Sequence, residues 1–156
     1  MSKYQLTEKP INVMWPDGIA VFVEKTGPFM ETAPAAWQEF HQKVGSLIGD
    51  CGFVSMTASY KVEPKMVYRA GAFVKTLPKK LPPGLKCEKF KGGKYAKFFM
   101  TGAYPNLPEA CGRVVDIVKA LKLPVIKDGW RLENYANDPK TTPEDKLITE
   151  IMVPIK

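Results

Sequence analysis

One acidic residue, Glu133, stands at a position where the surrounding pattern does not require an acid. It lies between Leu132 and Asn134 in a run typical of a β-strand, and it shares one face of that strand with Arg131 and Tyr135. A carboxylate held out of water is costly unless it is paired, and a lipophilic cation would provide that pairing. Two interpretations stay open on the residues alone: a buried carboxylate in an aromatic cavity, or an ordinary surface ion pair with Arg131.

Aromatic side chains and one methionine fall on the segments expected to surround this acid. Trp37 begins the apolar face of a predicted helix, and the others lie on predicted strands. Aromatic faces would each add about 0.5–2 kcal/mol to the binding of a cation, and methionine offers an adaptable surface. Core packing is the commoner role for each side chain taken alone. We predict the ligand-binding set Glu133, Trp37, Tyr60, Tyr68, Tyr135 and Met152.

Other chemistries lack the residues that they need. His41 is the single histidine and lies on a predicted helix, so no Ser-His-Asp or Cys-His-Asn set can be assembled with it. The three cysteines, Cys51, Cys87 and Cys111, do not have the spacing of metal ligands. No glycine-rich loop precedes a helix, as phosphate binding would require. We therefore expect no metal and no cofactor.

Composition and charge distribution limit the function further. The chain has 156 residues, of which 45% are hydrophobic and 25% charged, a globular composition that excludes a disordered or fibrous chain. The net charge is +7, and residues 75–94 hold seven lysines against one acid, Glu88. That tract lacks arginine and contains Phe90 as its one aromatic residue. We interpret it as a solvated linker, and we expect no direct DNA binding.

Nothing in the sequence predicts secretion or membrane insertion. The N-terminal residues form no apolar run of the signal-peptide type, and no apolar run approaches the roughly 20 residues that span a bilayer. The odd number of cysteines argues against a disulfide framework. We therefore expect a cytoplasmic protein without membrane contact.

An internal repeat organises the chain. At an offset of 75 residues, turn glycines, prolines and aromatic residues coincide: Gly18 with Gly93, Gly27 with Gly102, Phe29 with Tyr104, Tyr60 with Tyr135 and Pro64 with Pro139. Such ordered matches indicate duplication of one structural unit. We predict a single domain over 1–156, with repeat one at about 18–76, a Lys-, Pro- and Gly-rich exposed linker at 77–92, and repeat two at about 93–156.

Each unit is predicted to form a strand, a helix and two further strands. The expected strands are 19–26, 53–61 and 66–76, then 95–101, 129–135 and 147–155. The expected helices begin at the N-cap candidates Thr32 and Asn106, and they end at Gly49 and Pro124. Two such units would build one antiparallel sheet with both helices on one face, an α+β fold with a pseudo-twofold axis.

Two residues of the predicted set break the repeat. The position equivalent to Glu133 is Ala58, and the position equivalent to Trp37 is Gly112. The unit can therefore fold without the acid and without the large ring. We place both side chains in the cleft between the helices, along the pseudo-twofold axis, where a ligand would bind.

The chain resembles the GyrI-like small-molecule-binding family, which includes DNA gyrase inhibitory proteins and the effector-binding domains of multidrug-responsive transcription regulators. The matching segments are 92–96, 101–102, 131–139 and 149–155. The resemblance implies a doubled strand-helix-strand-strand fold that binds amphipathic, often cationic, aromatic compounds between its halves. It also implies that Glu133, two residues before Tyr135, is the pocket glutamate. The chain departs from the family pattern at Gly71, where an acid is frequent, and at Met152, where an aromatic residue is frequent.

The leading hypothesis is a stand-alone small-molecule-binding protein that captures lipophilic cations. Only 17 residues precede Gly18, too few for a helix-turn-helix domain. One alternative is an enzyme, because some proteins of this family hydrolyse strained cyclopropane-containing natural products. Glu133 would then be the general base, with the Tyr135 hydroxyl polarising a substrate carbonyl. Another alternative is a protein-interaction module like the gyrase inhibitors, with a protein partner that the sequence does not identify.

Overall fold

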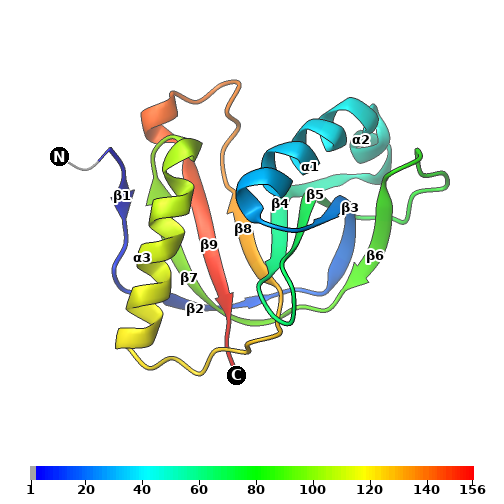
Figure 1. Cartoon of the computed structure of the whole chain (residues 1–156). Coiled ribbons are helices and arrows are strands. Elements are labelled where there is room, and N and C mark those ends of the chain that lie inside the picture. Colours follow the sequence, from blue (N-terminus) through cyan, green and yellow to red (C-terminus); the bar gives the residue numbers. More distant parts are fainter. Residues whose placement is uncertain (1–2) are drawn as a thin grey trace.

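Within residues 3–156, which this computed structural model describes, nine strands form one antiparallel sheet (Figure 1). Their order is β1-β7-β9-β8-β4-β5-β3-β6, and β2 also pairs with β7. The strands are β1 (Gln5–Leu6), β2 (Ile11–Trp15), β3 (Gly18–Thr26), β4 (Phe53–Lys61), β5 (Val67–Val74), β6 (Lys86–Phe90), β7 (Gly93–Thr101), β8 (Arg131–Tyr135) and β9 (Ile148–Pro154). The helices are α1 (Phe29–Lys43), α2 (Leu47–Cys51) and α3 (Leu107–Ala120), with short 3-10 turns η1 (Tyr104–Asn106) and η2 (Glu144–Lys146).

The predicted α+β duplication is confirmed by the strand order. The first unit contributes β3-β5-β4 and the second contributes β7-β9-β8, and the units join where β4 pairs with β8. Ala58 lies opposite Glu133 at this junction, and these are the two positions related by the sequence repeat. The pseudo-twofold axis therefore passes through the Ala58–Glu133 pair.

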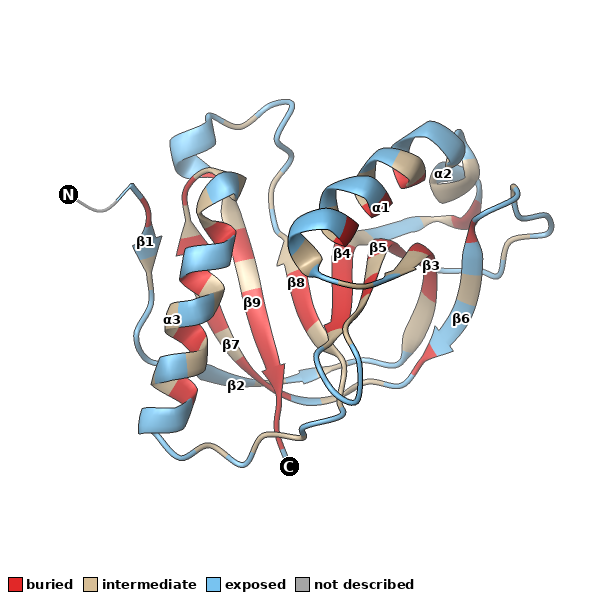
Figure 2. Ribbon diagram, viewed as in Figure 1, coloured by how far each residue is buried: buried red, intermediate tan, exposed pale blue. Residues whose placement is uncertain are grey.

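The helices cover one face of the sheet, and each has its own core beneath it. Side chains such as Phe40 pack under α1, whereas Phe98 and Val114 pack under α3. A further cluster, which includes Leu132 and Met152, lies on the opposite face. Buried residues accordingly occur at consecutive positions of the central strands, as at Ile151–Pro154 of β9 (Figure 2). Because each helix is anchored to its own half, neither helix covers the β4–β8 junction.

One of the two predicted helix starts is wrong. Helix α1 begins at Phe29, after Pro28, so Thr32 lies inside the first turn. The Thr32 hydroxyl donates a hydrogen bond to the Pro28 carbonyl oxygen at 3.1 Å instead of capping free N–H groups. The other predicted start is correct, because Asn106 is the N-cap residue of α3. Its side chain makes no capping bond and donates a hydrogen bond to the Ala103 carbonyl oxygen at 3.2 Å.

The first predicted helix is also too long at its end. A continuous helix to Gly49 was expected from the apolar spacing, but α1 ends at Lys43 and Gly45 has a φ of 50°. Glycine adopts this left-handed conformation without the steric cost that other residues incur. Leu47 and Ile48, which would continue the apolar face, belong to the separate short helix α2.

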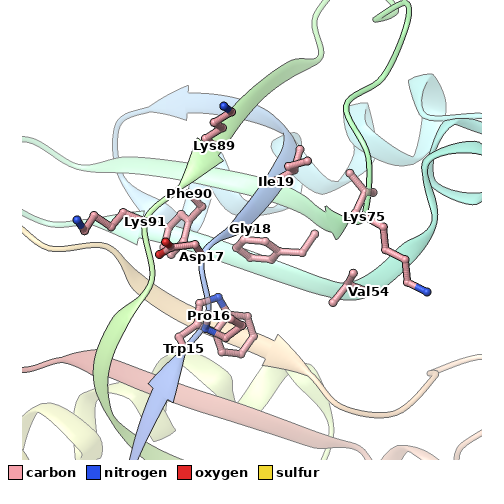
Figure 3. A pocket seen from close by; sticks show the side chains of 12 residues that line it. Trp15, Pro16, Asp17, Gly18, Ile19, Val54, Lys75, Lys89, Phe90 and Lys91 are labelled. Atoms are coloured by element: carbon pink, nitrogen blue, oxygen red, sulfur yellow. The ribbon is translucent and has the colours of Figure 1, made fainter.

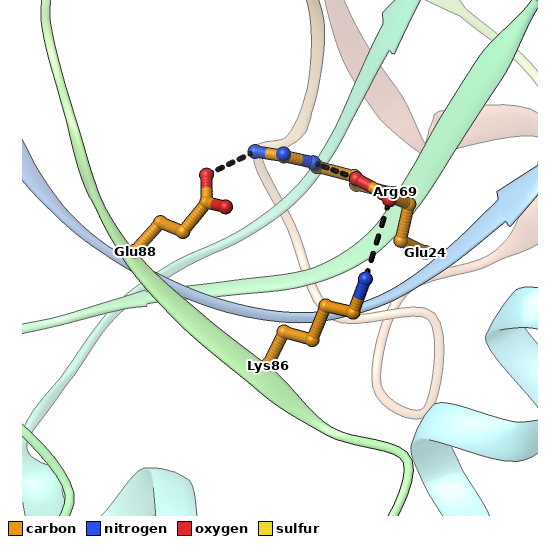
Figure 4. Close-up of polar contacts among 4 residues, drawn as sticks. All are labelled: Glu24, Arg69, Lys86 and Glu88. Carbon is orange, nitrogen blue, oxygen red and sulfur yellow. Dashed lines mark hydrogen bonds and ion pairs between the residues drawn. The ribbon is translucent and has the colours of Figure 1, made fainter.

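The tract expected to be an exposed linker contains an edge strand. Strand β6 pairs with β3, and both its last residue, Phe90, and the preceding Leu85 are buried. Arg69 forms two ion pairs, one with Glu88 at 3.0 Å and one with Glu24 at 2.8 Å (Figure 4). The expectation that 77–92 is exposed is therefore wrong at Leu85 and Phe90, because β6 joins the sheet and these two side chains pack into the core.

No helix within residues 3–156 is long and apolar enough to cross a membrane.

Strands β1 and β2, which lie before the first repeat, are two elements that the sequence analysis does not predict. They pair with the outer edge of β7 and lengthen the sheet beyond the two repeated units.

We expect Gly71→Ala to destabilise the protein by about 1–3 kcal/mol, because overpacking a tight site forces neighbouring atoms apart. A Cβ at this position would collide with the Val21 carbonyl oxygen and lie 2.8 Å from the Phe22 Cα. The control is Gly112→Ala on the exposed face of α3, where no heavy atom lies within 4 Å. It should stabilise the helix by about 0.5–1 kcal/mol. Urea unfolding measures both, and unchanged stability of Gly71→Ala would contradict the close approach.

Candidate functional site

A cleft of about 1100 Å³ opens over the junction of the two units. Its walls come from α1, from η1 with the start of α3, and from the loop 136–140. Its floor comes from strands β4, β5 and β8. A cavity of this size between two halves of a fold is large enough for a drug-sized molecule. The cleft is thus at the place that the repeat predicted.

Glu133 lies at the floor of this cleft, next to the pseudo-twofold axis. It is only 9% exposed. Its carboxylate accepts a hydrogen bond from the Tyr135 hydroxyl at 3.0 Å and another from the Cys111 thiol at 3.3 Å. No ion pair between described residues includes Glu133. The surface ion pair with Arg131 is therefore not formed, and the buried-carboxylate interpretation is the one that the geometry matches.

The surroundings of Glu133 disfavour charge. Burial raises the pKa of Glu133 above its ordinary value of 4.5, although the hydrogen bonds from Cys111 and Tyr135 lower it in part. Burial likewise raises the pKa of the Cys111 thiol and of the Tyr60 and Tyr135 hydroxyls, and the nearby Glu133 charge raises them further. These neighbours stay neutral near pH 7, so they solvate the carboxylate as dipoles and leave its charge uncompensated.

Aromatic rings surround the carboxylate. The ring centroids of Trp37 and Tyr135 are 5.4 Å apart, and those of Tyr60 and Tyr68 are stacked at 6.3 Å. The Trp37 indole N–H donates a hydrogen bond to the Tyr68 hydroxyl at 2.9 Å, which fixes the two rings across the space between α1 and β5. The structure brings all four predicted aromatic residues to the cleft together with Glu133.

Met152 does not belong to this group. It is fully buried on the opposite face of the sheet, where it pairs with Leu132, whereas Glu133 pairs with Ile151. Because side chains alternate along a strand, the register that places Ile151 on the helix side turns Met152 away. The placement of Met152 among the ligand-binding residues is corrected accordingly.

Sequence reasoning missed several residues that line the cleft. Phe29 and Tyr104 occupy equivalent positions at the starts of α1 and η1, and both rings face the cleft. Their coincidence in the repeat was the signal that could have found them. His41 and Cys111 also line the cleft, and for the cysteine the available signal was that its repeat equivalent is Ala36.

A second cavity of about 640 Å³ lies beside Trp15 and Phe90 (Figure 3). Three lysines line it, Lys75, Lys89 and Lys91, against one acid, Asp17. This surplus of positive charge disfavours a cationic ligand there. Nowhere in residues 3–156 do three or more histidine, cysteine or acidic residues gather as a metal site would require.

The model of the GyrI-like small molecule binding domain matches residues 9–156. The structure of SAV2435 bound to tetraphenylphosphonium is similar, with a TM-score of 0.72 and 18% identity over 99% of this chain and 94% of that chain. The EcmrR C-terminal domain gives a TM-score of 0.76 and 14% identity over 98% of both chains. A hydrolase from Listeria innocua gives 0.60 and 11% identity over 96% of this chain and 93% of that chain. At these identities the neighbours show a shared fold. No curated protein sequence matches the chain.

We expect Glu133→Gln to stabilise the empty protein at neutral pH. A carboxyl whose folded-state pKa is raised contributes stability that is fully present below its unfolded pKa and is lost as the pH rises through the folded pKa. The glutamine variant avoids this loss, so the variant should exceed wild type in unfolding free energy at pH 7 and not at pH 4. Urea titrations of both proteins at pH 7 and pH 4 measure this difference in unfolding free energy. A variant that is less stable than wild type at pH 7 would contradict an uncompensated charge.

Proposed function

The chain belongs to the GyrI-like small-molecule-binding domain family, and from this premise we propose that it binds amphipathic aromatic cations in the cleft over Glu133. The observation that carries the proposal is a carboxylate that is 9% exposed, walled by aromatic rings, and without a cationic partner among residues 3–156. A ligand cation supplies the charge that the protein does not.

The energetics favour a large, lipophilic cation over a small ammonium ion. Folding has already removed water from Glu133, so the binding of a cation does not require the acid to be dehydrated again. The electrostatic attraction between the cation and the carboxylate is also weakly screened in this site. A cation whose charge is spread over an apolar body loses little hydration on entry. Each ring that it contacts adds about 0.5–2 kcal/mol. The complex of SAV2435 with tetraphenylphosphonium, a cation of this class, supports the choice of ligand.

We expect the cleft to accept ligands of several different shapes. The cleft walls come from two helices that are anchored in separate cores, and the space between them is about 1100 Å³. Several cations of similar size can therefore place a charged centre near the carboxylate while their aromatic groups find different ring contacts. Charge and lipophilicity, more than precise outline, define the ligand class.

We expect Glu133→Gln to weaken binding of methyltriphenylphosphonium by about 2–5 kcal/mol, the range for removing one partner of a buried charge pair. Binding of triphenylphosphine oxide, which has nearly the same shape and no net charge, should change little. Isothermal titration calorimetry with both ligands measures the two losses.

The matched control for this substitution is Glu109→Gln. Glu109 lies on the exposed side of α3, so the control changes the net charge of the protein by the same amount without entering the cleft. It should leave both affinities unchanged. Equal losses for the cation and the neutral ligand in Glu133→Gln would contradict the proposed electrostatic role.

Cation binding should also depend on pH in a defined direction. The affinity for methyltriphenylphosphonium should be constant above the raised pKa of Glu133 and fall as the pH decreases through it, because protonation removes the countercharge. His41 lines the cleft as well, so the titration belongs in a His41→Asn background. The neutral phosphine oxide should show no such decrease, and a decrease common to both ligands would contradict the assignment to Glu133.

A further inference from the structure

Cys111 is the cysteine that lines the cleft. Its thiol lies 3.3 Å from a carboxylate oxygen of Glu133 and donates a hydrogen bond to it. The other two cysteines are elsewhere, Cys51 at the end of α2 and Cys87 on the edge strand β6. The cleft therefore holds a soft nucleophile on its α3 wall in direct contact with a buried base on its floor.

The repeat shows that packing does not require this pair. The residue equivalent to Cys111 is Ala36, and the residue equivalent to Glu133 is Ala58. Both alanines are fully buried in the core beneath α1. The same unit thus folds with two methyl groups where the second half places a thiol and a carboxylate, and in the second half both polar groups face the cavity.

We propose that the cleft is a covalent trap for cationic alkylating agents, in which Cys111 is the nucleophile and Glu133 the base. This inference rests on the proposed function for the capture of the cation. As the sulfur attacks the electrophilic carbon, the C–S bond forms while the bond from carbon to the leaving group breaks. The thiol proton passes to the Glu133 carboxylate, and the leaving group departs as an anion to solvent. The product is a thioether, and no other reactant is needed.

The geometry explains why a bound cation would react and a small polar reagent would not. In an apolar cleft beside a carboxylate the thiol stays protonated, and burial raises the pKa of Cys111. Reaction without a base in contact would require a buried thiolate, which is unfavourable. Transfer of the proton to Glu133 avoids this intermediate, and a ligand held over the carboxylate keeps its electrophilic carbon close to the sulfur.

The test uses (4-iodobutyl)triphenylphosphonium as the probe and intact-protein mass spectrometry as the readout. The wild type should gain one adduct, which peptide mapping places on Cys111. Tetraphenylphosphonium should protect against labelling. Cys111→Ala should lose the adduct, whereas the matched control Cys87→Ala, outside the cleft, should keep the adduct and bind methyltriphenylphosphonium as the wild type does.

The role of the base is tested separately. In Glu133→Gln the labelling rate at saturating probe should fall by roughly 100-fold, as expected for loss of a general base. Measuring the rate at saturation separates loss of the base from weaker binding. Weaker binding raises the probe concentration needed for saturation but does not lower the rate at saturation. The neutral phosphine oxide with the same iodobutyl chain should label wild type more slowly than the phosphonium does.

The failure of each idea gives a different result. If tetraphenylphosphonium binds but the probe leaves Cys111 unmodified, or modifies Cys51 or Cys87 instead, the trap is overturned while the proposed function stands. If tetraphenylphosphonium neither binds nor protects, the proposed function and the trap are both overturned. An unchanged saturated rate in Glu133→Gln overturns the role of Glu133 as the base.

Discussion

A negative charge that is buried without a compensating positive group is the constraint around which the cleft is arranged. Glu133 accepts hydrogen bonds from a thiol and a phenol, and neither group supplies charge. Burial without a partner is unfavourable for an ionised carboxylate, so this position lowers the stability of the empty protein. Functional sites commonly carry such local costs, and the rest of the fold is arranged so that the cost is confined to one residue.

The pseudo-twofold architecture is what creates the site. Each helix is fixed to the core of its own half, so the sheet is left uncovered where β4 meets β8. The axis passes through a pair of equivalent positions: Ala58 is buried in the core beneath α1, whereas Glu133 lines the cleft. Duplication thus supplies a symmetric hollow, and divergence at Glu133, Trp37 and Cys111 makes it chemically asymmetric.

Much of this arrangement could be predicted because the repeat is a property of the sequence. Aligning the halves identified Glu133 as an exception, and alternation placed it on the same face as Tyr135. The face of the sheet on which Met152 lies could not be predicted in the same way. A long loop joins β8 to β9, so nothing local sets their register, and a shift of one residue reverses the face. Likewise, the strand at 86–90 forms by long-range pairing with β3, which composition does not reveal.

The most direct measurement is a crystal structure of the protein with (4-bromophenyl)triphenylphosphonium, in which anomalous scattering from bromine fixes the orientation of the ligand. The account predicts the phosphorus centre within about 6 Å of the Glu133 carboxylate, close enough for an opposite charge to stabilise it. The rings of the ligand should contact Trp37 and Tyr135. A cation bound instead beside Trp15 and Phe90, or a complex in which Glu133 pairs with Arg131 and the ligand lies elsewhere, would contradict it.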